Sequence, residues 1–348
     1  MSVSTGTVEA IISEFKLKAA AQVSQPMGGP GIEPRGAHPH HHGIATAEFR
    51  VWANLGPELG RGLFARPKEY PAYVRFSNAG GAPSDSIPDF RGMAIKVMGV
   101  EGERLLVHEI PEDEANTQDF HLTNLPVFFA HDPEDLHDFL VLRRKIREAG
   151  SDKAAAAALN QKLATDFPVI QKAGVIQNPF RVAYFSQTPY ALGNGCVVKY
   201  QARPRVVEAP LSQEDLARTN PTAFYLQDAM VETLKGGEDV VFDFMVQRQT
   251  DPIAMPIDDP RIDWDQGKSP FVPVATITIR ADQNQDFMSA ERMRFAEDIS
   301  FSPWHGLKEH RPVGRLNDAR REAYRQMAKH RHDTNHVAYK EPTGRNDF

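Results

Sequence analysis

The sequence has a single cysteine, Cys196, among its 348 residues. One thiol cannot form a disulfide within the chain, and it cannot form a zinc site made of cysteines alone. No run of about 18 apolar residues occurs, so the sequence predicts no membrane-spanning helix. Residues 1–8 lack the basic start and apolar stretch of a secretory signal. We therefore expect a cytoplasmic protein.

An excess of positive charge is also missing. Lys and Arg total 40 against 46 Asp and Glu, which gives a formal net charge of −6. This balance argues against nonspecific binding to nucleic acid or to an anionic membrane, and neither is expected as a partner. Hydrophobic residues make up 41% and charged residues 25% of the chain, which excludes a mainly disordered protein.

The hydrophobic pattern predicts strands on both sides of a central helical block. Residues 7–22 have the apolar spacing of a helix, and residues 23–43, rich in Pro, Gly and His, are expected to form a loop. Alternation predicts strands at 44–53, 70–78, 91–100, 119–124, 195–203, 239–249 and 272–280. Helices are expected from Asp132 onward and at 152–165, 212–220, 223–236 and 317–331. The pattern favours one α+β domain at 31–348, built on an antiparallel meander or barrel and preceded by a helix and arm at 1–30.

Histidine is concentrated in one short segment. Arg35 and His38 lead into His40, His41 and His42, directly before the first expected strand. Consecutive histidine side chains usually point in different directions, so a solvated loop is the plainer interpretation and a metal cluster is an alternative. The metal alternative predicts bound zinc or nickel and a colourless protein. A histidine held beside a strand can instead move protons near neutral pH.

Two further groups of residues have the chemistry to serve an anionic cofactor or a metal. Arg75 lies in the strand pattern Val-Arg-Phe-Ser, either as an ordinary alternating polar residue or as the partner of an anionic ligand group. On the last expected helix, Arg320 and Tyr324 are four positions apart and share a face. An arginine beside a phenol lowers the phenol pKa, and a phenolate suits ferric iron. Taken alone, a solvated arginine beside a partly buried tyrosine explains this pair more plainly.

In this order, the motifs resemble those of the haem catalase family. The matching pieces are R-x-x-H at 35–38, V-R-F-S at 74–77, D-x-R-G-x-A-x-K at 89–96, N-x-P-V-F-F-x-x-D-P at 124–133, F-S-P at 301–303 and R-x-x-x-Y at 320–324. They extend over most of the chain. The resemblance implies an α+β fold in which haem b is buried between an antiparallel β-barrel of about eight strands and the flanking helices.

The resemblance also implies a role for each matching residue. It places His38 at the distal catalytic histidine, which Ser77 orients. Tyr324 is the implied ligand of the haem iron, and Arg320 is its charge partner. The remaining implied positions are two propionate-binding arginines and an aromatic pair by the distal pocket: Arg35, Arg75, Phe128 and Phe129.

The sequence departs from the family pattern at several positions. Thr123 stands where the family has a distal asparagine, and Asn124 follows as a neighbour or a substitute, so both are candidate catalytic residues. Leu136 replaces a phenylalanine that covers the haem. The segment after His38 needs a one-residue insertion, which makes residues 40–42 rivals for the distal role. The chain is also shorter than typical members, and we predict a minimal core without an NADPH site and, if it forms a homo-oligomer, a weaker association.

The predicted function is haem-dependent reduction of hydrogen peroxide or organic hydroperoxides with an electron donor. Thr123 and the shorter chain favour peroxidase chemistry over fast disproportionation. Two alternatives on the same scaffold stay open at this point. One is the rearrangement of a fatty-acid hydroperoxide to an allene oxide, and the other is haem binding without turnover.

Overall fold

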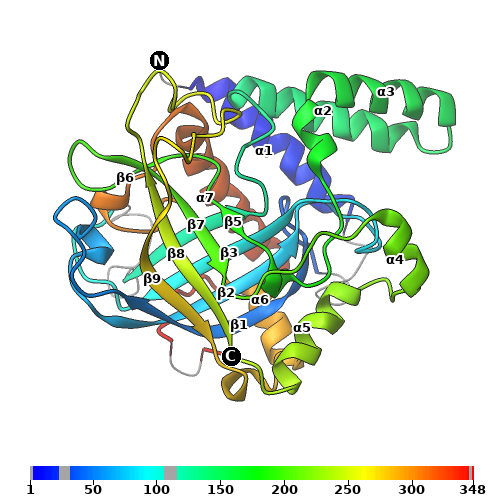
Figure 1. The fold of residues 1–348 in the computed structure, drawn as a ribbon. Helices are drawn as coiled ribbons and strands as arrows, with labels where there is room; N and C mark the ends of the chain where they lie inside the picture. The colour runs from blue at the N-terminus through cyan, green and yellow to red at the C-terminus, as the bar shows by residue number, and fades with distance from the viewer. Residues whose placement is uncertain (1–2, 23–31, 106–115, 345–346) are drawn as a thin grey trace.

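The computed structural model describes residues 3–22, 32–105, 116–344 and 347–348, and it has the predicted α+β fold with a β-barrel (Figure 1). Eight antiparallel strands close the barrel in the order β1, β2, β3, β4, β5, β7, β8, β9 and back to β1. A short strand, β6 (Tyr190–Ala191), pairs with β7 outside this ring. The barrel strands are β1 (His40–Val51), β2 (Glu69–Asn78), β3 (Arg91–Met98), β4 (Thr117–Thr123), β5 (Tyr184–Phe185), β7 (Val197–Pro204), β8 (Val240–Arg248) and β9 (Val272–Ile279).

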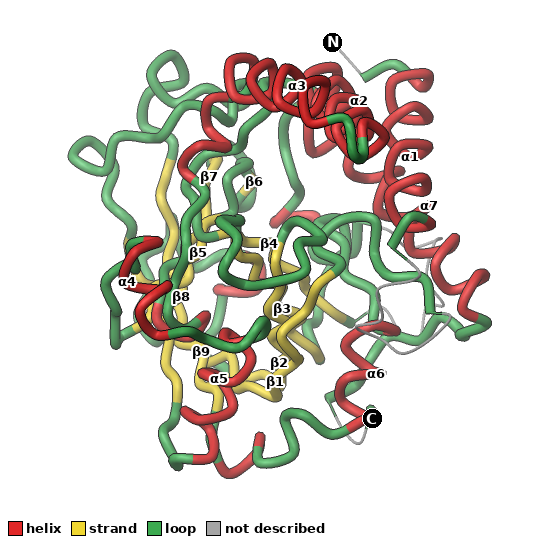
Figure 2. Tube along the Cα trace, turned by 90° about the vertical axis from the view of Figure 1, so that its right-hand side faces the viewer, coloured by secondary structure: helices red, strands yellow, loops and turns green. Residues whose placement is uncertain are grey.

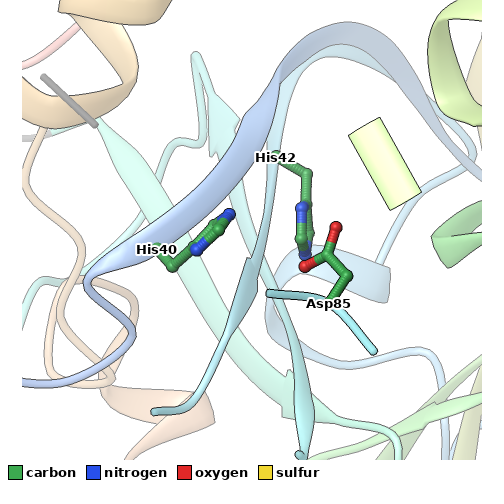
Figure 3. A group of neighbouring side chains, drawn as sticks. All are labelled: His40, His42 and Asp85. Atoms are coloured by element: carbon green, nitrogen blue, oxygen red, sulfur yellow. The ribbon is translucent and has the colours of Figure 1, made fainter. Parts of the chain in front are cut away.

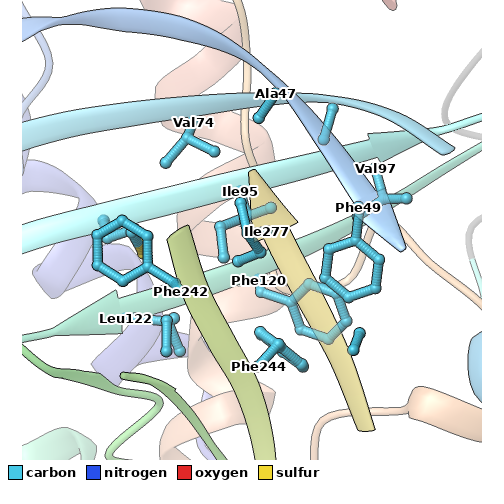
Figure 4. Close-up of a cluster of buried hydrophobic side chains, with 14 of the residues drawn as sticks. Ala47, Phe49, Val74, Ile95, Val97, Phe120, Leu122, Phe242, Phe244 and Ile277 are labelled. Carbon is cyan, nitrogen blue, oxygen red and sulfur yellow. The ribbon is translucent and has the colours of Figure 1, made fainter. Parts of the chain in front are cut away.

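The interior of the barrel is an apolar core. Successive strand residues point to opposite faces, so every second residue of each strand enters this core. Phe49, Phe120 and Phe244 meet there, with ring centroids 4.7–6.2 Å apart (Figure 4). The alternate residues of β2, β3 and β4 point outward from the barrel, and helices cover this outer face.

Seven helices lie around the barrel in the described part of the chain. Their bounds are α1 (Thr5–Ala20), α2 (Pro133–Ala149), α3 (Lys153–Asp166), α4 (Gln213–Thr219), α5 (Tyr225–Lys235), α6 (Ala290–Asp298) and α7 (Arg315–Asn335). Helix α1 packs against both α2 and α7, beside the barrel (Figure 2). Helix α2 begins as the sequence predicts, because Asp132 accepts a hydrogen bond from the Asp135 N–H and Pro133 occupies the first turn.

The prediction that the loop beginning at residue 23 extends to residue 43 is wrong at its C-terminal boundary. Strand β1 begins at His40, because His40 and His41 pair with Asn78 and Ser77 of β2. The register shifts between His41 and Gly43, so one extra residue is accommodated as a β-bulge. This bulge lies where the resemblance called for a one-residue insertion. The three histidines are consequently buried strand residues and not a solvated loop.

Three elements had no counterpart in the prediction. Strands β5 and β6 contain two residues each, which is too short for alternation to be visible. Helix α6 is short and polar on most of its surface, so its sequence does not predict a helix. The predicted division at residue 30 falls outside the described residues, and the separation of 1–30 from 31–348 stays a prediction. Among the described residues, none of the helices combines the length and the apolar character that a membrane span needs.

Candidate functional site

A cavity of about 700 Å³ lies between the outer face of β2–β4 and the helices α1, α2 and α7. Its position follows from strand parity, because the residues that alternate with the barrel core face these helices. Nine of the ten predicted site residues line this cavity: Arg35, His38, Arg75, Ser77, Thr123, Phe128, Phe129, Arg320 and Tyr324. Asn124 is the one that does not. Segments almost 300 residues apart in sequence therefore meet around one cavity.

His38 is held against the outer face of the barrel. Its backbone has a φ of 53°, and its Nδ1 lies 3.0 Å from the Ser77 hydroxyl. The Arg75 guanidinium also donates to the His38 carbonyl at 3.3 Å. A Cβ atom on Gly92 would lie 2.5 Å from His38 Nδ1 and 2.8 Å from Ser77 Oγ, so the ring needs a glycine beneath it. This contact gives a physical reason for the glycine of the D-x-R-G-x-A-x-K motif.

The surroundings of His38 keep its imidazole neutral. Burial, together with the nearby positive charges of Arg75, Lys18, Arg320 and Arg35, lowers the His38 pKa to about 3. A neutral imidazole can accept a proton from a bound molecule. Because Nδ1 is engaged with Ser77, Nε2 is the ring nitrogen left for that task.

Arg320 and Tyr324 form the expected pair on α7. Arg320 Nη2 donates to the Tyr324 hydroxyl at 3.2 Å, and its Nη1 donates to Thr188 and Asn317 at 3.2 Å. Burial lowers the Arg320 pKa, but the interactions with Tyr324 and Tyr190 outweigh it, so that the net shift is upward. The guanidinium is thus fixed as a cation beside the phenol oxygen.

Three arginines converge on the C-terminal end of α6. Arg35 and Arg75 donate to the Ala296 carbonyl at 3.2 and 3.0 Å, and Arg331 donates to the Asp298 carbonyl at 3.2 Å. The carbonyl end of a helix carries partial negative charge, which favours cations there. All three side chains also line the cavity.

These arginines share one buried carboxylate. Glu297 lies 3.9 Å from Arg75 Nη2 and 3.1 Å from His41 Nε2. Burial raises the Glu297 pKa, but His41, Arg75 and Arg35 together bring it down to about 2. The pKa of Arg331 is lowered to about 9 by burial and by the charge of Arg35, as expected where cations outnumber anions.

Thr123 and Asn124 have different surroundings. Thr123 is the last residue of β4, lines the cavity, and donates from its hydroxyl to the Leu125 carbonyl at 3.3 Å. Asn124 accepts the backbone N–H of Arg91 at 2.7 Å on its Oδ1, and its own N–H donates to the Arg91 carbonyl at 2.9 Å. The Asn124 amide therefore secures the start of β3, away from the cavity lining.

The end of the cavity toward α2 is apolar with a basic margin. The rings of Phe128 and Phe129 are 4.3 Å apart, and Phe139 lies 4.2 Å from Phe129. Leu136, at the position of the missing covering phenylalanine, also lines this end. Three cationic side chains border it: Lys18, Arg143 and Arg147.

Sequence reasoning missed several residues of the cavity, among them His121 and Arg331. His121 lines it, and its ring centroid lies 5.0 Å from that of Tyr324. Burial, and to a smaller extent the positive charge of Arg320, lowers the His121 pKa well below its ordinary value. Its parity with Thr123 on β4 was the signal that could have found it. Arg331 lies seven positions after Tyr324, two helical turns along the same face of α7. That spacing was visible in the sequence.

The fold is similar to those of solved catalases. A fungal catalase matches with a TM-score of 0.67 at 19% identity, over 87% of this chain and 61% of that one. Catalase A from Saccharomyces cerevisiae matches with a TM-score of 0.66 at 19% identity, over 90% of this chain and 66% of that one. A bacterial catalase matches with a TM-score of 0.66 at 18% identity, over 91% and 60%. The chain thus spans less than two thirds of the length of each.

No protein-family model matches the sequence, and no curated protein matches it. The likeness is therefore one of three-dimensional arrangement: an eight-stranded antiparallel barrel with helices over one outer face. At this level of identity it defines the fold, and the fold is the one that the ordered motifs predicted. The chain has the catalase-like α+β fold.

Proposed function

We propose that the chain binds haem b in this cavity and reduces hydrogen peroxide or organic hydroperoxides with electrons from a separate donor. One observation carries the proposal. The His38–Ser77 pair and the Arg320–Tyr324 pair, from opposite ends of the sequence, line the same cavity. A haem peroxidase requires two protein groups in the same cavity: an imidazole that accepts a proton and an oxygen ligand for the iron.

The charges of the described residues match those of the two haem propionates. Arg35, Arg75 and Arg331 bring three positive charges and Glu297 one negative charge, which leaves two positive charges for two propionates. Arg35 Nε is buried without a hydrogen-bond partner among the described residues, so a donor is available to a further carboxylate. The cavity volume of about 700 Å³ lies within the range of cofactor sites.

When bound, the haem supplies a redox-active iron, for which the Tyr324 oxygen is the protein ligand. His38 would accept the proton of one peroxide oxygen and pass it to the other as the O–O bond breaks. With two electrons from the donor and two protons from solvent, an organic hydroperoxide would give an alcohol and water, and hydrogen peroxide would give two water molecules. Ser77 holds the ring for this transfer, and Gly92 leaves room for it. Thr123 has a shorter side chain than the asparagine that the resemblance places at this position, so its hydroxyl reaches less far toward a bound peroxide. We expect this difference to favour peroxidase chemistry over rapid release of oxygen.

The balance of the two reactions is measured directly. Steady-state oxygen release from hydrogen peroxide is compared with oxidation of a dye donor under the same conditions. We expect donor oxidation to dominate. Oxygen release that is faster by orders of magnitude would contradict the preference for peroxidase chemistry.

A second candidate rests on the apolar end of the cavity. A fatty-acid hydroperoxide could place its chain along Phe128, Phe129 and Leu136 and its carboxylate near Arg143 or Arg147. Rearrangement to an allene oxide needs no electron donor. Product analysis with a lipid hydroperoxide separates the two candidates, because rearrangement gives an epoxide and peroxidase reduction gives an alcohol.

A further inference from the structure

The histidine segment contains a second group of side chains that the proposed function leaves without a role. Strand parity sends His41 toward Glu297 and brings His40 and His42 together on the other side, with ring centroids 5.3 Å apart. Asp85, from the loop between β2 and β3, completes the group (Figure 3). One possible ligand atom from each of the three residues lies within 4.8 Å of those of the other two. None of the three lines the haem cavity described above.

His42 has one unprotonated ring nitrogen. Asn78 donates from its Nδ2 to Asp85 Oδ1 at 2.7 Å, which fixes Asn78 Oδ1 as an acceptor. His42 Nε2, 2.9 Å from that oxygen, must therefore carry the hydrogen. His42 Nδ1 is then a lone pair, and it is buried with no hydrogen-bond partner among the described residues. A metal-binding histidine is typically oriented in this way, through its other ring nitrogen.

His40 and Asp85 complete a ligand set. His40 interacts with the Ala82 backbone, and its Nε2 is buried and unpartnered within the described chain. Burial lowers the pKa of both histidines, that of His40 to about 4, so both rings are neutral ligands at neutral pH. Asp85 accepts one hydrogen bond on each oxygen, from Asn78 and from the Leu226 N–H at 3.2 Å, and each oxygen keeps a free lone pair.

Two arginines act on this group: Arg91 contacts it directly, and the charge of Arg75 acts on His40. Arg91 donates to Asn78 Oδ1 and, at 3.1 Å, to the backbone carbonyl of Asp85. Neither bond goes to the Asp85 carboxylate. The carboxylate oxygens can therefore accept a metal ion, although burial raises the Asp85 pKa and the positive charge of Arg91 opposes tight binding.

We propose that His40, His42 and Asp85 bind one divalent transition-metal ion of the zinc class. Two imidazoles and a carboxylate are a common ligand set for zinc, with a fourth position for water. Ligands around tetrahedral zinc lie about 3.3 Å apart, so the three residues move closer together on loading. The ion ties the start of β1, two residues after His38, to the loop that carries Asp85.

A second cluster in the described chain offers a matched control. His131, Asp132 and Asp135 also lie within 4.8 Å of one another, but they are half-exposed and partnered. Asp132 caps α2 through the Asp135 N–H, and Asp135 accepts the His131 N–H at 3.1 Å. Loss of His131 should leave zinc binding at the buried site unchanged.

The test uses the full-length protein, stripped of metal with a chelator and titrated with Zn²⁺ by calorimetry. We expect one zinc per chain, with affinity reduced more than about 100-fold in His40→Gln and in His42→Gln. His131→Gln should bind zinc as the unaltered protein does. Circular dichroism confirms that each variant is folded.

Zinc-edge X-ray absorption on the unaltered protein tests the ligands without any substitution. Two imidazole nitrogens and a carboxylate oxygen in the first shell would support the proposal. It is overturned if the chain binds no zinc, if His40→Gln and His42→Gln bind zinc normally, or if only His131→Gln loses it.

Discussion

The two faces of the barrel wall are both buried, yet they have opposite chemistry. On β4, Phe120 and Leu122 enter the apolar interior, whereas Asp119, His121 and Thr123 point outward beneath the helices. The interior is filled by hydrophobic side chains, and the outer face encloses a cavity lined by cations and histidines. Strand parity thus separates the residues that stabilise the fold from those that can do chemistry. Substitutions on one face should affect stability, and substitutions on the other should affect reactivity.

The largest expected effect is on the outer face. His38→Ala should reduce peroxide turnover by about 10²–10⁴-fold, because it removes the group proposed to move the proton. The free energy of unfolding should change little, since His38 borders a cavity. Steady-state peroxidase assays and urea unfolding measure the two quantities.

His137→Ala, on α2, is the control for this substitution and should retain full turnover. The haem absorption of His38→Ala should persist. Undiminished turnover in His38→Ala would mean that another group moves the proton, with His121 the next histidine on the cavity wall.

A substitution in the interior should have the opposite effect. Phe120→Ala leaves a void among Phe49, Tyr200 and Phe244 and should lower the free energy of unfolding by about 3–5 kcal/mol. Turnover per folded molecule should stay close to normal. Ile253→Ala, at a position that is 93% exposed, should cost less than about 0.5 kcal/mol. Equal losses for the two variants in urea unfolding would remove the distinction between interior and surface.

Gly92 lies where a strand of the barrel wall touches the proposed catalytic histidine. Gly92→Ala places a methyl group against His38 and Ser77 and should destabilise the protein by about 1–3 kcal/mol. It should also reduce turnover, because the His38 ring must move. Gly56→Ala adds a methyl group to open space and serves as the control. Full activity in Gly92→Ala would show that the ring position does not matter.

The pH dependence of the free energy of unfolding gives a smaller effect, at the boundary of the barrel interior. His310, at the edge of the interior, accepts the Leu63 N–H at 2.9 Å, and burial lowers its pKa to about 3. In the unfolded chain His310 takes up a proton near pH 6.5, whereas in the folded chain it stays neutral. The free energy of unfolding therefore decreases as the pH falls below about 6.5. His310→Gln should make this loss shallower by roughly 1.4 kcal/mol per pH unit between about pH 6 and 4. An unchanged slope in urea unfolding would contradict the buried neutral state.

Much of the fold could be predicted because long strands show their parity in the sequence. The seven strands that were predicted all exist, and Arg75 and Ser77 alternate with Val74 and Phe76 as expected. The start of β1 was missed because three consecutive histidines look solvated until their pairing with β2 is known. Helix α6 was missed because no pattern in its own sequence indicates it. Its C-terminal carbonyls accept hydrogen bonds from three arginines of distant segments, and such long-range contacts cannot be seen in a local sequence.

The site was predictable where a motif places chemistry on a known element. Arg320 and Tyr324 are hydrogen-bonded as their spacing on a helix suggested. Asn124 shows the limit of that reasoning. Its neighbour Thr123 faces the cavity, but one position later the chain has left β4 and the amide holds the backbone of Arg91. Spacing alone does not reveal where a strand ends.

The most direct test of the account is the absorption spectrum of the purified protein and of Tyr324→Phe. We predict a Soret band and the charge-transfer bands of a phenolate-ligated ferric haem in the unaltered protein, and their loss in Tyr324→Phe. Tyr225→Phe should keep them, because the Tyr225 hydroxyl donates to the Ile176 carbonyl and neither residue lines the cavity. A colourless unaltered protein, or a Tyr324→Phe variant with unchanged pigment and reactivity, would contradict the proposed haem site.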